Sequence, residues 1–111
     1  MDTSEKKLLG KKLRQARKEL ELTGEKLAEL CHIDATYFRQ IESGTKIPSL
    51  PVFVSLCREL KVSPAYLLSD LLPEPEIREM DAMWELWQKA SPGQLRLISA
   101  MLRTALDHIP D

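Results

Sequence analysis

A short run of side chains in the middle of the chain could form hydrogen bonds from one face of a helix. The face is made of five neighbouring positions: Ala35, Thr36, Tyr37, Arg39 and Gln40. Phe38 and Ile41 are three positions apart, so the same helix would turn them the other way, into a core. Amide and guanidinium groups can pair with base edges or phosphate groups. An ordinary solvated helix face has the same composition, so both interpretations stay open at this point.

Patterns that would indicate catalysis or metal binding are missing from the sequence. It has no nucleophile motif, no glycine-rich phosphate loop and no cluster of carboxylates or histidines. Cys31 and Cys57 are 26 positions apart and belong to no Cys-x-x-Cys pair. We therefore expect buried thiols rather than a disulfide or metal ligands, and we expect a protein that is not an enzyme and needs no cofactor.

Apolar residues recur every three or four positions along most of the chain, which predicts an all-α fold. The first stripe consists of Leu9, Leu13, Ala16 and Leu20. Four residues are suited to cap the N-termini of the following helices: Thr23, Asp34, Ser49 and Ser63. The third helix, about residues 35–43, should end at Gly44. The chain should turn near His32 and Ile33 before this helix, because Asp34 is a strong N-cap.

The segment Leu72-Pro73-Glu74-Pro75 is the clearest break in the helical pattern, because two prolines in four residues cannot continue a helix. It divides the chain into residues 1–72 and residues 73–111. Two more helices are predicted in the second part, the last one opened by a capping box at Ser91 and Gln94. Their apolar stripes consist of Ile77, Met80, Trp84 and Trp87, and of Leu95, Ile98, Leu102, Ala105 and Ile109.

Charge is unevenly distributed along a chain whose formal net charge is only −1. Residues 1–61 carry 12 Lys and Arg against 9 Asp and Glu, whereas residues 62–111 carry 4 against 8. The first part could thus approach a polyanion while the second faces elsewhere. We see no signal-peptide core and no apolar run long enough for a membrane span, so we expect a cytoplasmic protein without membrane contact.

The residues around the polar face resemble the phage-repressor (Cro/cI-like, or XRE) family of helix-turn-helix regulators. The matching motif residues are Leu22-Thr23, Leu27-Ala28, Ile33-Asp34, Phe38, Ile41-Glu42, Gly44 and Pro48-Ser49. The resemblance covers about residues 8–71 and implies a five-helix, lambda-repressor-like DNA-binding domain. Two positions depart from the family pattern: Gly24 stands where the family often has Gln, and His32 stands where it has Gly.

The resemblance also implies roles for individual residues. Base contacts would come from Ala35, Thr36 and Gln40, while Arg39 could read a guanine or grip a phosphate. Phosphate contacts would come from Tyr37, Thr45, Lys46 and, through its backbone N–H alone, Gly24. Arg17 and Glu42 match family positions that form a buried or half-buried ion pair between the first and third helices.

From these expectations we predict that the protein binds double-stranded DNA sequence-specifically. We further predict a transcriptional repressor that acts as a homodimer on a palindromic operator. The C-terminal helices would supply the dimer interface, through Met80, Trp84, Trp87, Leu95, Ile98, Leu102, Ala105 and Ile109. The alternative is that these helices pack back on their own chain. A further alternative for the whole protein is an antitoxin or an interaction adaptor with the same fold, which would bind a protein partner through its C-terminal helices.

Overall fold

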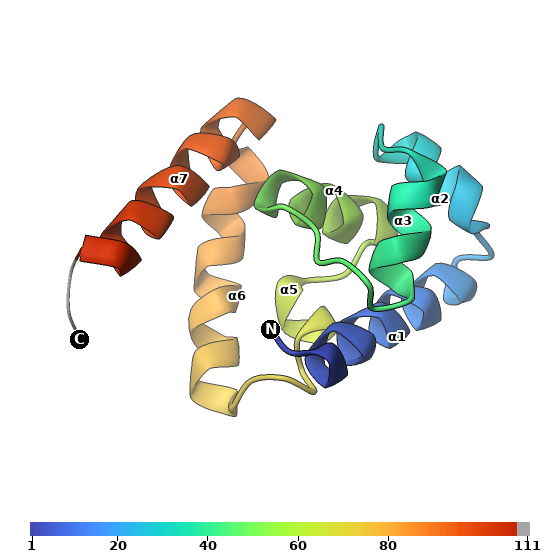
Figure 1. Ribbon diagram of the computed structural model, residues 1–111, viewed down its shortest axis with the longest axis horizontal. Helices are drawn as coiled ribbons and strands as arrows, with labels where there is room; N and C mark the ends of the chain where they lie inside the picture. The colour runs from blue at the N-terminus through green and yellow to red at the C-terminus, as the bar shows by residue number, and fades with distance from the viewer. Residues whose placement is uncertain (109–111) are drawn as a thin grey trace.

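The computed structural model describes residues 1–108, with the side chains of residues 103 and 105–108 excepted, and this part of the chain forms seven α-helices and no strand (Figure 1). The helices are α1 (Thr3–Glu19), α2 (Gly24–Leu30), α3 (Ala35–Glu42), α4 (Leu50–Leu60), α5 (Pro64–Leu67), α6 (Glu74–Lys89) and α7 (Pro92–His108). The predicted all-α architecture, five helices followed by two, is confirmed.

Local capping signals define where the helices begin. The side chains of Thr23, Asp34, Ser49 and Ser63 each accept a hydrogen bond from a backbone N–H in the first turn of the following helix. Ser91 and Gln94 form the predicted capping box. Asp2 and Glu5 form another at the start of α1, which was not predicted from the sequence. Local side-chain chemistry therefore marks the start of every helix except α6, which follows Pro73 without a side-chain cap.

The core lies between α1, α2, α3, α4 and α5. Leu13, Phe38 and Ile41 are almost completely buried there, as predicted. Leu20 is 39% exposed, contrary to its place in the predicted stripe, because α1 ends at Glu19 and the chain turns away at the C-cap. Both cysteines are buried free thiols, and burial raises the pKa of Cys57 to about 12.

Gly10 lets α1 approach the backbone of α3 closely. A Cβ atom at this position would lie 2.2 Å from the carbonyl oxygen of Glu42 and 3.0 Å from that of Ile41. Backbone atoms cannot rotate out of the way as a side chain can. The absence of a side chain at position 10 is therefore a condition for the contact between α1 and α3.

The C-terminal helices pack on the side of the molecule opposite α2 and α3. α6 lies against α4 and α5, and α7 lies against α4 (Figure 1). Trp84 packs against the core cluster, and Leu95 is only 1% exposed. The Arg58 guanidinium on α4 donates hydrogen bonds to the carbonyl oxygens of Trp87 and Gln88, which lie near the end of α6. Some residues of the predicted dimer interface therefore pack within their own chain.

Some apolar side chains of α6 and α7 remain exposed. They are Met83, Leu86, Leu97, Met101 and Leu102. Of the predicted interface residues, Leu95 is buried, so its assignment to a dimer contact is corrected. Met80 and Trp87 are half-buried and line an apolar hollow of about 290 Å³ beside Phe53.

Trp84 and Ile98 are half-buried as well, whereas Leu102 is exposed as the prediction requires. The side chain of Ala105 and the whole of Ile109 lie outside the described residues.

Across the described residues, no helix is long and apolar enough to cross a membrane.

Gly10→Ala should destabilise the fold by about 1–3 kcal/mol or more, because the added methyl group forces α1 away from α3. Urea unfolding followed by circular dichroism measures this change. Gly93→Ala is the matched control, since a Cβ there would have no neighbour closer than 3.8 Å and should leave stability equal or slightly higher. If Gly10→Ala were as stable as the wild type, this result would contradict the close contact between α1 and α3.

Candidate nucleic-acid interface

α2 and α3 are joined by a tight turn that fixes their relative orientation. His32, which stands where the family has Gly, adopts a left-handed conformation with φ of 57°, as the family resemblance implies for this position. The N–H of Ile33 donates to the carbonyl oxygen of Ala28, and Asp34 then caps α3. Hydrogen bonds from the backbone N–H groups of Thr36 and Tyr37 hold the pKa of Asp34 below its usual value. The carboxylate therefore stays charged, and keeps the cap, to a lower pH than an ordinary aspartate would.

The outer face of α3 carries three of the predicted base-contact residues. Thr36 and Arg39 are exposed, and Gln40 is half-buried. Among the described residues, the side-chain amide of Gln40 has no hydrogen-bond partner, although its backbone carbonyl accepts from Thr45 and Lys46. The amide is consequently available to an external partner.

Two predicted contact residues are less exposed than the sequence suggested. Ala35 and Tyr37 are half-buried and pack against the core cluster. Tyr37 precedes Ile41 by four positions, so its ring borders the buried stripe rather than facing directly outward. This corrects the expected orientation of Tyr37, while its role as a phosphate contact stays a prediction.

The segment after α3 folds back on the last turn of the helix. Gly44 has φ of 85°, and the N–H groups of Thr45 and Lys46 both donate to the carbonyl oxygen of Gln40. The hydroxyl groups of Ser43 and Thr45 are 3.0 Å apart. Thr45 and Lys46 are thereby held, with exposed side chains, beside the outer face of α3.

Gly24 opens α2 next to the α3 face. A Cβ atom at this position would make only ordinary contact, 3.5 Å from the ring of Phe38. A lack of room for a side chain therefore does not explain why glycine occupies this position, where related domains often have glutamine. The backbone N–H of Gly24 is what this position can offer to a phosphate.

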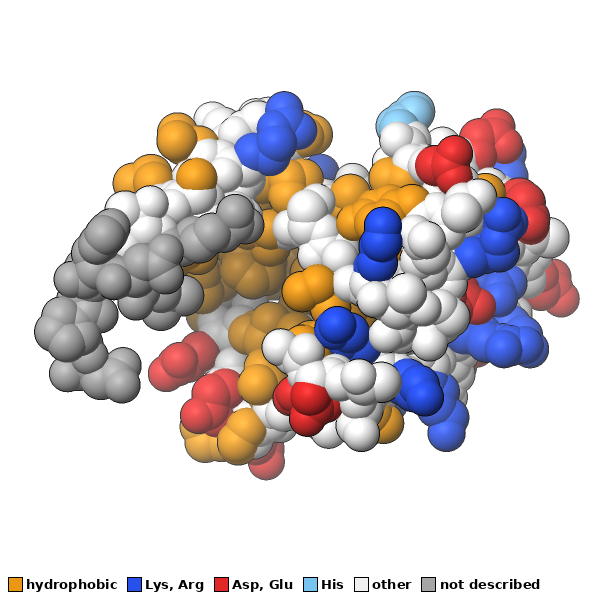
Figure 2. All heavy atoms as spheres, in the orientation of Figure 1, with side chains coloured by type: hydrophobic (Ala, Val, Ile, Leu, Met, Phe, Trp, Pro, Cys, Tyr) orange, Lys and Arg blue, Asp and Glu red, His pale blue; other side chains and the backbone are white. Residues whose placement is uncertain are grey.

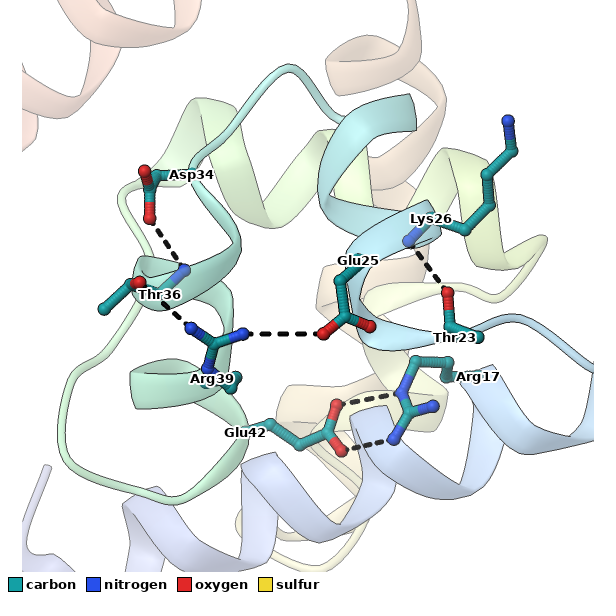
Figure 3. Close-up of polar contacts among 8 residues, drawn as sticks. All are labelled: Arg17, Thr23, Glu25, Lys26, Asp34, Thr36, Arg39 and Glu42. Carbon is teal, nitrogen blue, oxygen red and sulfur yellow. Dashed lines mark hydrogen bonds and ion pairs between the residues drawn. The ribbon is translucent and has the colours of Figure 1, made fainter.

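Arg17 and Glu42 join α1 to α3, as the family resemblance implies. Arg17 Nη2 lies 2.7 Å from Glu42 Oε1, and Arg17 Nε donates to the second carboxylate oxygen at 3.1 Å (Figure 3). Arg17 Nη1 also donates to the carbonyl oxygen of Leu22. The hydrogen bond to Glu42 raises the pKa of Arg17 above its ordinary value. Both side chains are about one-seventh exposed, so solvent screens the pair only in part.

An open groove of about 630 Å³ separates α3 from the start of α2. Three arginines and three glutamates line it: Arg14, Arg17, Arg39, Glu21, Glu25 and Glu42. Arg39 Nη1 lies 3.5 Å from Glu25 Oε1, and Arg39 Nη2 donates to the Thr36 hydroxyl at 3.0 Å (Figure 3). The contact between Arg39 and Glu25 was not predicted from the sequence, because the two residues are 14 positions apart.

Basic side chains are concentrated on the surface of the N-terminal part of the chain. Figure 2 shows Lys and Arg side chains gathered mainly over the part of the molecule that contains α1 to α3, and hydrophobic side chains in the hollow beside α6. Acidic side chains are interspersed among the basic ones. The region around α3 is therefore mixed in charge rather than uniformly basic.

Comparison with known proteins adds independent information. A family model described as a helix-turn-helix domain matches residues 10–70, more than half of the chain. The chain is similar to the solved structure of the clp gene regulator ClgR from Corynebacterium glutamicum, with 26% sequence identity and a TM-score of 0.57. That likeness covers 75% of this chain and 86% of ClgR. A search of curated proteins gave no match.

Arg17→Lys should lower the free energy of unfolding by about 1–3 kcal/mol, because lysine keeps the charge but cannot make the paired hydrogen bonds to Glu42. Urea unfolding gives the value. Arg14→Lys, on the exposed side of the same helix, should change it by less than about 0.5 kcal/mol. Equal effects of the two substitutions would show that the paired hydrogen bonds between Arg17 and Glu42 add nothing to the stability of the fold.

Proposed function

The chain belongs to the XRE-type helix-turn-helix family, and from this premise we propose that it is a sequence-specific DNA-binding transcriptional regulator. The finer proposal is that it acts as a homodimeric repressor on a palindromic operator. One observation carries the proposal: the outer face of α3 and the segment after it are open to an external partner. α6 and α7 lie at the opposite end of the molecule and leave this surface uncovered (Figure 1).

The proposed base contacts come from α3. Gln40 can pair with adenine through its unpartnered amide, and the methyl groups of Ala35 and Thr36 can pack on a thymine methyl group. Arg39 can pair with guanine. A helix of this length fits the major groove when its first turns face the base edges.

The proposed phosphate contacts flank the base contacts on both sides. Lys46 and Thr45 lie after α3, and Gly24 lies across the groove at the start of α2. Tyr37 completes the proposed set from α3 itself. These contacts would position the protein on the duplex without selecting a sequence.

We place the boundary between the DNA-binding domain and the C-terminal segment at residues 72 and 73, close to the end of the family match at residue 70. The exposed apolar residues of the C-terminal helices support a dimer. Exposed methionine and leucine side chains on two neighbouring helices are typical of an interaction surface. Of the residues first predicted, Leu102 is about half exposed and can contact a partner. Two copies would double the number of base pairs read.

Gln40→Ala should weaken binding to the preferred duplex by about 1–3 kcal/mol and relax the base preference at one position, because the amide pair with adenine is lost. Lys46→Ala should instead weaken binding to all duplexes alike and lower the salt slope by about 1. Fluorescence anisotropy with labelled duplexes at several salt concentrations separates the two effects. If neither substitution changed binding, the surface around α3 would not be the DNA-binding site.

The double substitution Leu97→Lys and Met101→Lys should convert a dimer to a monomer in sedimentation velocity, because it buries two charges in the proposed interface. Lysine favours helix about as much as leucine and methionine do, so α7 itself should persist.

The matched control is the double substitution Gln15→Lys and Glu19→Gln on α1. It makes the same change in net charge at two exposed, polar positions outside the C-terminal helices, and it should leave the dimer intact. A Leu97→Lys and Met101→Lys variant as dimeric as the wild type would exclude the apolar surface of α7 as the interface.

A further inference from the structure

We propose that Glu25 determines sequence specificity, by holding Arg39 in position for a base and by weakening attraction to phosphate in the groove beside it. The inference rests on the proposed DNA-binding function and assigns Arg39 to base reading, a choice that the sequence left open. The juxtaposition that carries it is the line of contacts from Thr36 through Arg39 to Glu25, which bridges α3 and α2 (Figure 3).

The orientation of Arg39 is set from both sides. Thr36 and Glu25 each take one N–H of the guanidinium, at 3.0 and 3.5 Å. A guanidinium has five N–H groups, so three stay available to a further partner. A guanine needs two of them, for its O6 and N7 atoms. Arg39 can thus remain anchored to the protein while it contacts a base.

The contact between Arg39 and Glu25 is exposed, with 60% and 71% of the two side chains open to solvent. Exposed ion pairs add little to folding stability. Its consequence is therefore local: it restricts a long, flexible side chain on the DNA-facing surface. Restricting that side chain before binding lowers the entropy lost on contact with the correct base.

The same carboxylate changes the electrostatics of the groove. Glu42 already balances Arg17, and Glu25 balances Arg39, so two of the three arginines that line the groove have an acidic partner there. A phosphate approaching the start of α2 also meets the charge of Glu25 itself. Since phosphate contacts supply the affinity that is common to all sequences, Glu25 lowers that affinity and leaves the base-dependent part in place.

The test first selects preferred duplexes for the wild-type protein from a random-sequence library. Affinity is then measured for the selected duplex and for a scrambled duplex, with wild type, Glu25→Gln and Glu29→Gln. Glu29 is the matched control, because it lies one turn further along α2, is about equally exposed and pairs with Lys26 rather than Arg39. Both substitutions remove the same charge.

Glu25→Gln should bind the scrambled duplex about 3–10-fold more tightly at low salt, and its preference for one guanine should fall at least about 5-fold. Glu29→Gln should leave that preference unchanged. In an Arg39→Ala background, Glu25→Gln should no longer alter base preference, because the effect acts through Arg39.

Equal changes in Glu25→Gln and Glu29→Gln would overturn the inference, as would an effect on base preference that persists without Arg39. A wild-type protein that selects no sequence from the library would instead contradict the proposed function, and this result would be seen before any variant is measured.

Discussion

The contact between α1 and α3 is the constraint on which the rest of the structure depends. Gly10 allows the two backbones to meet, and the ion pair between Arg17 and Glu42 crosses the same contact. The first interaction sets how close the helices come, and the second is directional and limits rotation. Together they fix the angle at which α3 leaves the core and therefore the direction in which Thr36 and Gln40 point. A helix free to roll by one residue would turn this face by about 100°.

What the sequence predicted well was local. Caps such as Thr23 and Asp34 and the apolar stripe of α3 each depend on residues within a few positions of one another. The physical determinants are therefore visible in the chain itself. The same is true of the polar face, whose position on α3 follows from the burial of Phe38 and Ile41.

Features that depend on packing between distant segments could not be predicted in this way. Leu95 was expected in a dimer interface, but it packs within its own chain, where α7 lies against α4. The apolar stripe that contains Leu95 has the same spacing whether α7 packs against its own chain or against a second copy. The contact between Arg39 and Glu25 is set by the angle between α2 and α3 and leaves no local pattern. Gly10 did carry a signal, because glycine is unfavourable inside a helix and its presence there indicates close packing.

The balance of charge around α3 bears on why a second copy would matter in the proposed dimer. Regulators gain much of their affinity from phosphate contacts, yet here Glu25 and Glu42 lie beside the arginines of the groove and the chain as a whole has a net charge of −1. One domain of this kind would therefore gain less affinity from charge than a uniformly basic domain would. Linking two such domains makes the second binding event intramolecular and raises affinity without adding basic residues. In the proposed dimer, pairing through the exposed apolar side chains of α6 and α7 would supply affinity, and the α3 face would supply selectivity.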